Sequence, residues 1–276
     1  MSIEANIVEH YGTSELLAAI EAGIHGLGKT RSTVTVEDLG PVDEFHVGGR
    51  AATTALCDRL GVGPDSEVLD IGCGIGGTAR HLASTTGCRV VGVDLVPGYV
   101  AVARELTDWT GLADRISYEV GSALDLPVAD SAVDVATLIH VGMNIEDKER
   151  LFSEAHRVLR PDGTLGVYDL MRVGDGDIGF PVPWASDPST SFVADVDAYE
   201  AALTAAGFEI LETRDRREFA LEFFARLRER TAELGGPAPL GLHVIIGAVA
   251  PDKLGNLVEA ITSGTLAPVE ITCRAS

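Results

Sequence analysis

Basic side chains are scarce in this sequence of 276 residues, with 21 lysines and arginines against 42 aspartates and glutamates. The formal net charge is therefore −21 at pH 7. Proteins that bind nucleic acid or anionic membranes need clustered basic residues, so this balance argues against both kinds of partner. The arginines between positions 214 and 230 alternate with acids, which predicts a solvated helical face rather than a nucleic-acid surface.

Cysteine is also scarce, and no CxxC pair occurs. The four cysteines are irregularly spaced, at Cys57, Cys73, Cys88 and Cys273. This spacing predicts neither a disulfide framework nor a zinc site and favours reduced thiols in a cytoplasmic protein. The longest apolar run, Val244 to Val249, is too short to span a bilayer. Met1 to Asn6 has no basic n-region of a signal peptide.

Strand-like and helix-like segments alternate from residue 67 onward, and 46% of the residues are hydrophobic. Strands are expected at 67–71, 89–94, 116–120, 133–139, 164–169, 209–213 and 268–274. Helices are expected at 77–86, 97–107, 145–159, 197–206, 216–235 and 251–263. This alternation predicts an α/β fold, a doubly wound, mostly parallel sheet covered by helices on both faces.

Two further helices, at 14–24 and about 49–60, are expected ahead of the first strand, separated by a turn-rich stretch at 40–49. We therefore divide the chain into a helical N-terminal lid segment, residues 1–66, and a cofactor-binding domain, residues 67–276. The second part contains a helical insertion at about 216–263 before the last strand. The insertion could act as a substrate lid or as the subunit contact of a homodimer.

The most informative local pattern is Val68-Leu-Asp-Ile-Gly-Cys-Gly-Ile-Gly-Gly77. It combines a buried strand, a glycine-rich turn and the start of a helix. Gly72 and Gly74 would let the backbone approach a ligand, and the following glycines would let helix and strand pack closely. Asp94 ends the next strand, where a carboxylate can accept hydrogen bonds from ribose hydroxyls. The pattern therefore predicts a nucleoside-binding loop.

Which nucleoside binds is a separate question, because Gly72, Gly74 and Gly77 also satisfy GxGxxG. A dinucleotide-dependent oxidoreductase is therefore one alternative, and a non-catalytic cofactor-binding module is another. Asp70 counts against the first, because its carboxylate at the end of the strand would repel a pyrophosphate and attract an ammonium or sulfonium group.

With Gly92-Val-Asp-Leu, Val133-Asp-Val-Ala-Thr-Leu-Ile-His and Leu159-Arg-Pro-Asp-Gly-Thr-Leu, the glycine loop resembles the class I S-adenosylmethionine-dependent methyltransferases. The resemblance implies a seven-stranded sheet whose last strand is antiparallel. It also implies that S-adenosylmethionine is the cofactor. The cofactor-binding residues that the resemblance implies, together with Asp70, are Gly72 and Gly74 at the methionine part, Asp94 at the ribose, Leu95 on the adenine face, and Ser122 and Ala123 at the adenine edge.

A looser resemblance connects the chain to small-molecule methyltransferases similar to the tocopherol, phosphoethanolamine and sarcosine/dimethylglycine enzymes. It rests on Phe45-His-Val-Gly-Gly, on His140 followed by Met143-Asn-Ile-Glu-Asp-Lys, and on Phe180-Pro-Val-Pro-Trp. It implies in-line transfer of a methyl group to a nitrogen or oxygen atom of a small metabolite. No metal is expected, because His140-Val-Gly-Met stands where catechol-type enzymes place acids for Mg²⁺.

Three residues are candidates for the chemistry. His140 follows the fourth strand at its carboxyl end, where ligands bind in open α/β sheets, and could act as a base, an orienting group or a cofactor contact. His46 lies in the segment expected to pack over the cofactor. The resemblance implies that Tyr11 could cover the methyl group.

Several other side chains have a functional and a structural interpretation. Asp43 and Glu44 could attract a cationic amine or lie solvated in a loop. Tyr168 and Asp169, expected at the end of the fifth strand, could point into the pocket. Trp184 and Phe180 could form a lid over a methylated cation or only the core of their own long loop.

Overall fold

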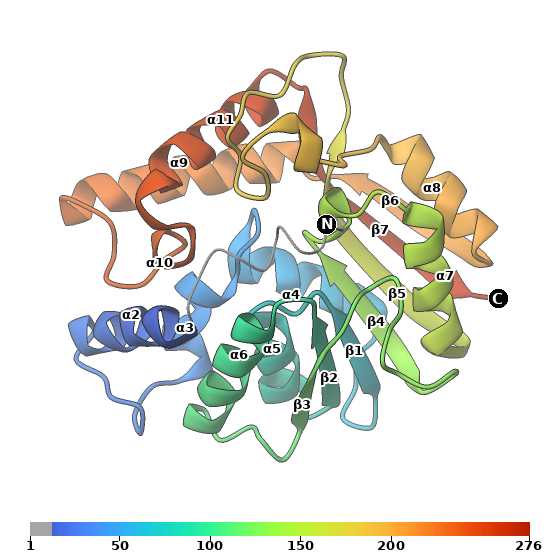
Figure 1. Cartoon of the computed structure of the whole chain (residues 1–276), viewed down its shortest axis with the longest axis horizontal. Helices are drawn as coiled ribbons and strands as arrows, with labels where there is room; N and C mark the ends of the chain where they lie inside the picture. The colour runs from blue at the N-terminus through green and yellow to red at the C-terminus, as the bar shows by residue number, and fades with distance from the viewer. Residues whose placement is uncertain (1–12) are drawn as a thin grey trace.

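The computed structural model describes residues 13–276, and at its centre is a seven-stranded sheet in the order β3-β2-β1-β4-β5-β7-β6 (Figure 1). Strands β1 to β5 pair in parallel with one another, whereas β7 is antiparallel to both β5 and β6. The predicted fold class is confirmed. The strands are β1 Glu67–Ile71, β2 Arg89–Asp94, β3 Ile116–Val120, β4 Val133–Ile139, β5 Leu159–Arg172, β6 Phe208–Asp215 and β7 Leu266–Ala275.

The strand order reverses between β1 and β4. From β1 the chain passes outward to β2 and β3, and from β4 it passes in the other direction to β5. At such a switch point the crossover connections diverge and leave a crevice at the carboxyl ends of the strands. The glycine loop that follows β1 and the residues that follow β4 therefore lie at the ligand-binding edge of this sheet.

Helices cover both faces of the sheet. On one face lie α4 (Gly49–Leu60), α5 (Gly77–Thr86) and α6 (Pro97–Trp109), which share an apolar cluster with β1, β2 and β3. On the other lie α7 (Lys148–Val158) and α8 (Val196–Ala205). Helix α7 buries Leu151, Phe152, Ala155 and Val158, whose spacing places them on one helical face.

The remaining helices are α2 (Thr13–Gly26), α3 (Val36–Asp43), α9 (Arg217–Leu234), α10 (His243–Ile246) and α11 (Ala250–Thr262). Helix α2 shares an apolar cluster with Leu240 and with Ile245 of α10. Helices α9 and α11 share another with Val47, next to His46. The insertion therefore contacts both the N-terminal helix and the segment that carries His46 (Figure 1). Short 3-10 turns occur at Gly142–Asn144, Pro188–Thr190 and Gly247–Val249.

Three local expectations are wrong. Helix α3 replaces the first part of the turn-rich stretch, because Thr35 and Asp38 form a capping box at its start. Helix α7 begins at Lys148, since Asp147 caps it by accepting a hydrogen bond from the Arg150 N–H. Strand β5 continues to Arg172 along antiparallel β7, so the residues expected at its end lie within it.

Within residues 13–276, the longest apolar helical segments fall short of what a membrane crossing requires.

Candidate functional site

The glycine loop closes on β2. The backbone N–H groups of Gly72 and Cys73 both donate to the Val93 carbonyl, at 2.7 and 3.0 Å. Gly72 has a φ of 73°, and a Cβ there would lie 2.2 Å from Val141, so this glycine serves a close internal contact. Gly74 has a φ of 53°, and a Cβ there would meet nothing within 4 Å. The open side of the loop is therefore at Gly74.

The next two glycines admit neighbouring elements. A Cβ on Gly76 would lie 2.3 Å from the Tyr118 hydroxyl of β3. A Cβ on Gly77 would lie 2.4 Å from the Asp43 carbonyl at the end of α3. The tight packing predicted at these positions thus joins the loop to α3 as well as to the sheet.

Asp94 is held at the end of β2 by the loop that it faces. Its Oδ2 accepts a hydrogen bond from the Gly74 N–H at 2.8 Å, and its Oδ1 accepts one from the Val96 N–H at 2.9 Å. Burial raises the pKa of this carboxyl, and the two backbone bonds oppose the increase. Each oxygen keeps a lone pair for a further donor, so the oriented carboxylate fits the two hydroxyls of a ribose.

Leu95, Ser122 and Ala123, the residues predicted at the adenine, are half-buried and lie near Asp94. Leu95 follows it directly. The loop that begins at Gly121 is joined to it, because the Gly121 N–H donates to the Asp94 carbonyl at 3.0 Å. In that loop the Ser122 hydroxyl accepts a hydrogen bond from the Leu124 N–H at 3.1 Å, and Ala123 packs against the core.

Asp70 is buried at the carboxyl end of β1. Its Oδ1 accepts a hydrogen bond from the Thr137 hydroxyl at 2.8 Å, whereas its Oδ2 has no partner among the described residues. Burial raises the pKa of Asp70 to about 7. The nearby charges of Glu44 and Asp94 act in the same direction, whereas the Thr137 hydroxyl and the Ala79 backbone lower it. A cationic ligand group at Oδ2 would supply the missing partner, whereas a pyrophosphate would add to the repulsion.

His140 lies directly after β4 in a strained backbone conformation, with a φ of 54°. Its N–H donates to the Tyr168 carbonyl at 2.8 Å, and its ring stacks on the Tyr168 ring with centroids 5.5 Å apart. Nε2 of His140 and the Tyr168 hydroxyl are both buried without a partner in residues 13–276. Burial lowers the pKa of His140 well below its usual value, and so does His46. The imidazole is therefore neutral at neutral pH, and its unprotonated nitrogen can accept a hydrogen bond.

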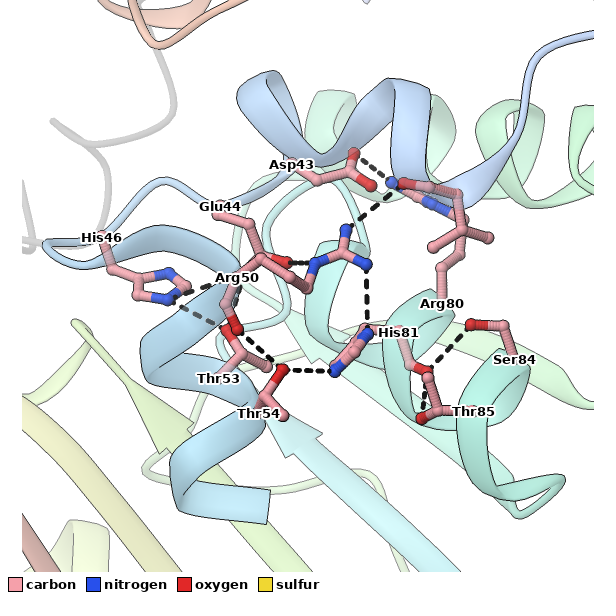
Figure 2. Close-up of polar contacts among 11 residues, drawn as sticks. Asp43, Glu44, His46, Arg50, Thr53, Thr54, Arg80, His81, Ser84 and Thr85 are labelled. Atoms are coloured by element: carbon pink, nitrogen blue, oxygen red, sulfur yellow. Dashed lines mark hydrogen bonds and ion pairs between the residues drawn. The ribbon is translucent and has the colours of Figure 1, made fainter. Parts of the chain in front are cut away.

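The structure brings His46 to His140, with ring centroids 5.8 Å apart. His46 is buried, and its Nε2 lies 3.0 Å from the Thr53 hydroxyl and 3.5 Å from Oε2 of Glu44 (Figure 2). Tyr168 completes the group, with its ring 6.1 Å from that of His46. Three side chains from distant parts of the chain therefore form one cluster at the carboxyl end of β4, where Tyr168 lies within β5.

The interpretation of Asp43 and Glu44 as solvated loop acids is wrong. Both are buried, and each is paired with an arginine, Asp43 with Arg80 at 2.5 Å and Glu44 with Arg50 at 2.5 Å (Figure 2). Neither is solvated. Both oxygens of Glu44 have partners within the protein, whereas Oδ2 of Asp43 has none among the described residues. No motif in the sequence connects these acids to arginines that belong to other helices, so the pairing could not be predicted.

Asp169 does not point into an open pocket. Its carboxylate accepts hydrogen bonds from the Tyr199 hydroxyl at 2.8 Å and from the backbone N–H groups of Met143 and Leu170 at 3.1 and 2.9 Å. It therefore ties α8 and the Gly142–Asn144 turn to β5. Trp184 donates its indole N–H to the Ser191 hydroxyl at 3.0 Å and packs on the cluster of α9 and α11. Tyr11 lies outside the described residues.

The arginines around position 216 are not simply a solvated helical face. Arg214 belongs to β6, and Arg216 precedes α9. Both pair with the buried carboxylate of Glu270, at 3.4 and 2.9 Å, and Arg59 of α4 joins them at 3.0 Å. Arg217 donates to carbonyls at the end of α11. Arg214, Arg216 and Arg217 therefore serve the junction of β6, β7, α9 and α11. Arg226, Arg228 and Arg230 are exposed on α9, as predicted.

No group of three His, Cys, Asp or Glu side chains suited to a metal ion occurs in the described part of the chain. The geometry instead combines an oriented carboxylate, an open glycine loop and a buried acid without a counter-charge at the switch point of the sheet. These features, in an α/β fold, fit a nucleoside that carries a cationic group.

Comparison with known proteins identifies the family. Residues 69–167 match the family model described as a methyltransferase domain. The chain is 32% identical over 184 residues to methyltransferase GfsG of Streptomyces halstedii, covering 66% of each chain. It is 28% identical to a glycine/sarcosine/dimethylglycine N-methyltransferase of Actinopolyspora halophila, over 85% of this chain and 42% of the relative.

A solved structure of phosphoethanolamine N-methyltransferase 2 of Haemonchus contortus, bound to phosphomonomethylethanolamine and S-adenosylhomocysteine, superposes with a TM-score of 0.70. The superposition covers all of this chain and 61% of the other. Because the two sequences are only 20% identical, the likeness shows a shared fold and no more. The chain belongs to the S-adenosylmethionine-dependent methyltransferase family, whose cofactor is S-adenosylmethionine. The dinucleotide and non-catalytic alternatives gain no support from these matches. Because the chain spans 66% of the first relative and 42% of the second, their activities do not transfer to it directly.

Proposed function

We propose that this protein transfers a methyl group from S-adenosylmethionine to a nitrogen or oxygen atom of a small-molecule acceptor. The observation that carries the proposal is Asp70, a buried carboxylate with one oxygen unpartnered, beside the open glycine loop and the oriented Asp94. A cofactor with a cationic amino-acid part and a ribose satisfies all three features. Bound S-adenosylmethionine would supply a methyl carbon already activated by the sulfonium.

The residues of the loop would hold the cofactor in parts. Asp70 would face its cationic group, and Gly72 and Gly74 its methionine part. Asp94 would accept hydrogen bonds from the ribose hydroxyls. Leu95 would cover the adenine face, with Ser122 and Ala123 at the adenine edge. Alignment of this kind contributes on the order of 7–11 kcal/mol to a displacement reaction.

The histidine pair would line the binding site of the methyl acceptor and take up the proton that the methyl acceptor releases. Burial keeps both imidazoles neutral by lowering their pKa values, and His140 has an unpartnered buried Nε2. A base of this kind contributes on the order of 10²–10⁴-fold to the rate. Tyr11 would cover the methyl group from the N-terminal side. His140 could also contact the cofactor.

Residues 1–66 and the insertion at about 216–263 would close over this site. The rest of the domain of residues 67–276 would form the site itself. The shared apolar clusters of α2 with α10, and of Val47 with α9 and α11, support a lid formed jointly by both segments. A homodimer contact through the insertion is the other proposal for it. The four cysteines are all free and buried, which fits a protein of the cytoplasm.

Calorimetric titration of the purified protein with S-adenosylmethionine, and separately with NADH, tests the proposal. Micromolar binding of S-adenosylmethionine alone is expected. Amines, amino acids and phenols would then be screened for methyl acceptance by detecting S-adenosylhomocysteine. Binding of NADH alone would overturn the proposal, because the glycine loop would then hold a dinucleotide.

A further inference from the structure

Glu44 connects the proposed site to α4. Its Oε1 accepts a hydrogen bond from Nε of Arg50 at 2.5 Å, and its Oε2 accepts one from the Thr53 hydroxyl at 2.7 Å. Nε2 of His46 lies 3.0 Å from the same hydroxyl and 3.5 Å from Oε2. Figure 2 shows these side chains in contact, with Arg50 and Thr53 on α4 and with Glu44 and His46 on the segment before it. The carboxylate and the imidazole therefore share one hydroxyl group.

The position of the protons follows from counting them. A threonine hydroxyl carries one hydrogen, and that of Thr53 is donated to Glu44. The contact between Thr53 and His46 then requires the imidazole to be the donor, so Nε2 of His46 carries the hydrogen. In the neutral ring, the lone pair that can accept a proton is then on Nδ1.

The charged and titratable groups around His46 differ from those around His140. Burial, the largest effect, lowers the pKa of His46; the charge of Glu44 and a backbone hydrogen bond at Gly49 raise it, and the charge of Arg50 lowers it. His140 and the Tyr168 hydroxyl, the other titratable groups against this ring, contribute no negative charge while both are neutral. For His140, burial and the charge of His46 act in the same direction, and no carboxylate opposes them. A proton taken up by the pair is therefore more stable on His46.

We infer that Glu44 and Thr53 are positioning residues, which hold His46 as the Nε2–H tautomer and stabilise its imidazolium, so that His46 retains the proton released by the methyl acceptor. The inference rests on the proposed function. The acceptor's lone pair forms the bond to the methyl carbon while the carbon–sulfur bond breaks and its electron pair stays on sulfur. The acceptor's proton passes to Nδ1 of His46, whose positive charge then lies beside Glu44.

The chain supplies a matched control on the same helix. Thr54 also has a hydroxyl in contact with a histidine, 3.0 Å from Nε2 of His81. His81 is 3.1 Å from a guanidinium nitrogen of Arg50, and its ring belongs to α5 (Figure 2). Thr54→Val therefore removes the same chemical group, one residue away, without touching His46.

Kinetics of Thr53→Val, Thr53→Ser and Thr54→Val test the inference. For Thr53→Val we expect kcat to fall about tenfold, while the KM for S-adenosylmethionine changes less than about twofold. The acid limb of its pH–rate profile should move to lower pH, because the imidazolium loses a hydrogen-bond acceptor. Thr53→Ser should restore the wild-type profile, and Thr54→Val should resemble the wild type. Equal losses in Thr53→Val and Thr54→Val, with unmoved profiles, would mean a merely structural role and overturn the inference.

A second measurement needs no methyl acceptor. Long-range ¹H–¹⁵N spectra of histidine-labelled protein report which ring nitrogen carries the hydrogen, and a His46→Gln variant assigns the signal. The wild type should show the Nε2–H tautomer at His46, and Thr53→Val a mixture of tautomers. A wild-type Nδ1–H tautomer would overturn the inference even if methyl transfer is found. If the tautomer is as expected but no acceptor is methylated, the proposed function fails and the positioning of His46 stands.

Discussion

Asp70→Asn isolates the charge of the buried acid at the end of β1. The amide keeps the size of the side chain and an oxygen that can accept the hydrogen bond of Thr137. In the folded protein the pKa of Asp70 is about 7, against 3.8 for an unperturbed aspartate. Between these two values the folded chain holds a proton that the unfolded chain has lost. The stability contributed by this group therefore falls as the pH rises from about 4 to about 7, and the asparagine does not share this loss.

The magnitude follows from the interval. About 1.5 pH units separate pH 5.5 from the folded pKa, and each unit corresponds to about 1.36 kcal/mol. The variant should therefore gain about 2 kcal/mol of unfolding free energy over the wild type between about pH 5.5 and pH 8.5. Urea unfolding at these two pH values measures the gain. A difference between the two proteins that stays constant with pH would refute the conclusion that burial raises the pKa of Asp70.

Cofactor affinity should change in the opposite sense. Loss of the charged partner should weaken S-adenosylmethionine binding by about 1.5–3 kcal/mol, the range for a hydrogen bond to a charged group. Calorimetric titration at about pH 8 measures it, since the wild-type carboxylate is ionised there. Asp169→Asn is the matched control, because Asp169 is also fully buried but has both carboxylate oxygens in hydrogen bonds away from the loop. Equal affinity of Asp70→Asn and the wild type would refute the assignment of Asp70 to the cofactor.

Three further substitutions test other parts of the site. Asp94→Ala should weaken S-adenosylmethionine binding by about 1.5–3 kcal/mol in calorimetry, and an unchanged affinity would contradict the ribose assignment. Gly74→Ala should lose cofactor affinity because its Cβ enters the open side of the loop, whereas Gly72→Ala should mainly lower the melting temperature because its Cβ meets Val141; the reverse order would contradict the placement of the open side. His140→Ala should lower kcat at least tenfold with little change in cofactor affinity, and wild-type values of both would make His140 structural.

The fold could be predicted because its signals are local. Each strand of the sheet is a short apolar segment between turn residues, and each crossover helix has its own periodicity. Helix α3 was missed because its eight residues contain Gly40 and Pro41, which are typical of a turn. What stabilises this helix is the Thr35 capping box and the burial of Leu39 and Val42. The second of these depends on distant segments and leaves no pattern in the sequence.

In the candidate site, too, features with a local signal could be predicted and contacts between distant segments could not. The positions of the glycine loop, directly after β1, and of Asp94, the last residue of β2, could be predicted, because the carboxyl ends of neighbouring parallel strands meet. Whether an acid is solvated, paired or unpaired could not be predicted. Glu44 looks like a loop acid, and only the fold brings Arg50 and Thr53 to its two oxygens. The contact of His46 with His140 likewise joins a residue that precedes the glycine loop in the sequence to one that follows it.

The pairing of the buried acids explains why Asp70 is informative. The chain has twice as many acids as bases, and its buried acids differ in how many arginine partners they have. Glu270 has three arginines, while Asp43 and Glu44 each have one. Asp70 accepts a hydrogen bond from the Thr137 hydroxyl, and the carboxylates of Glu44 and Asp94 repel its negative charge. A neutral side chain there would make the fold more stable at neutral pH. Such a destabilising group is typical of a site where function opposes stability, and a cationic ligand would supply the charge that the fold omits.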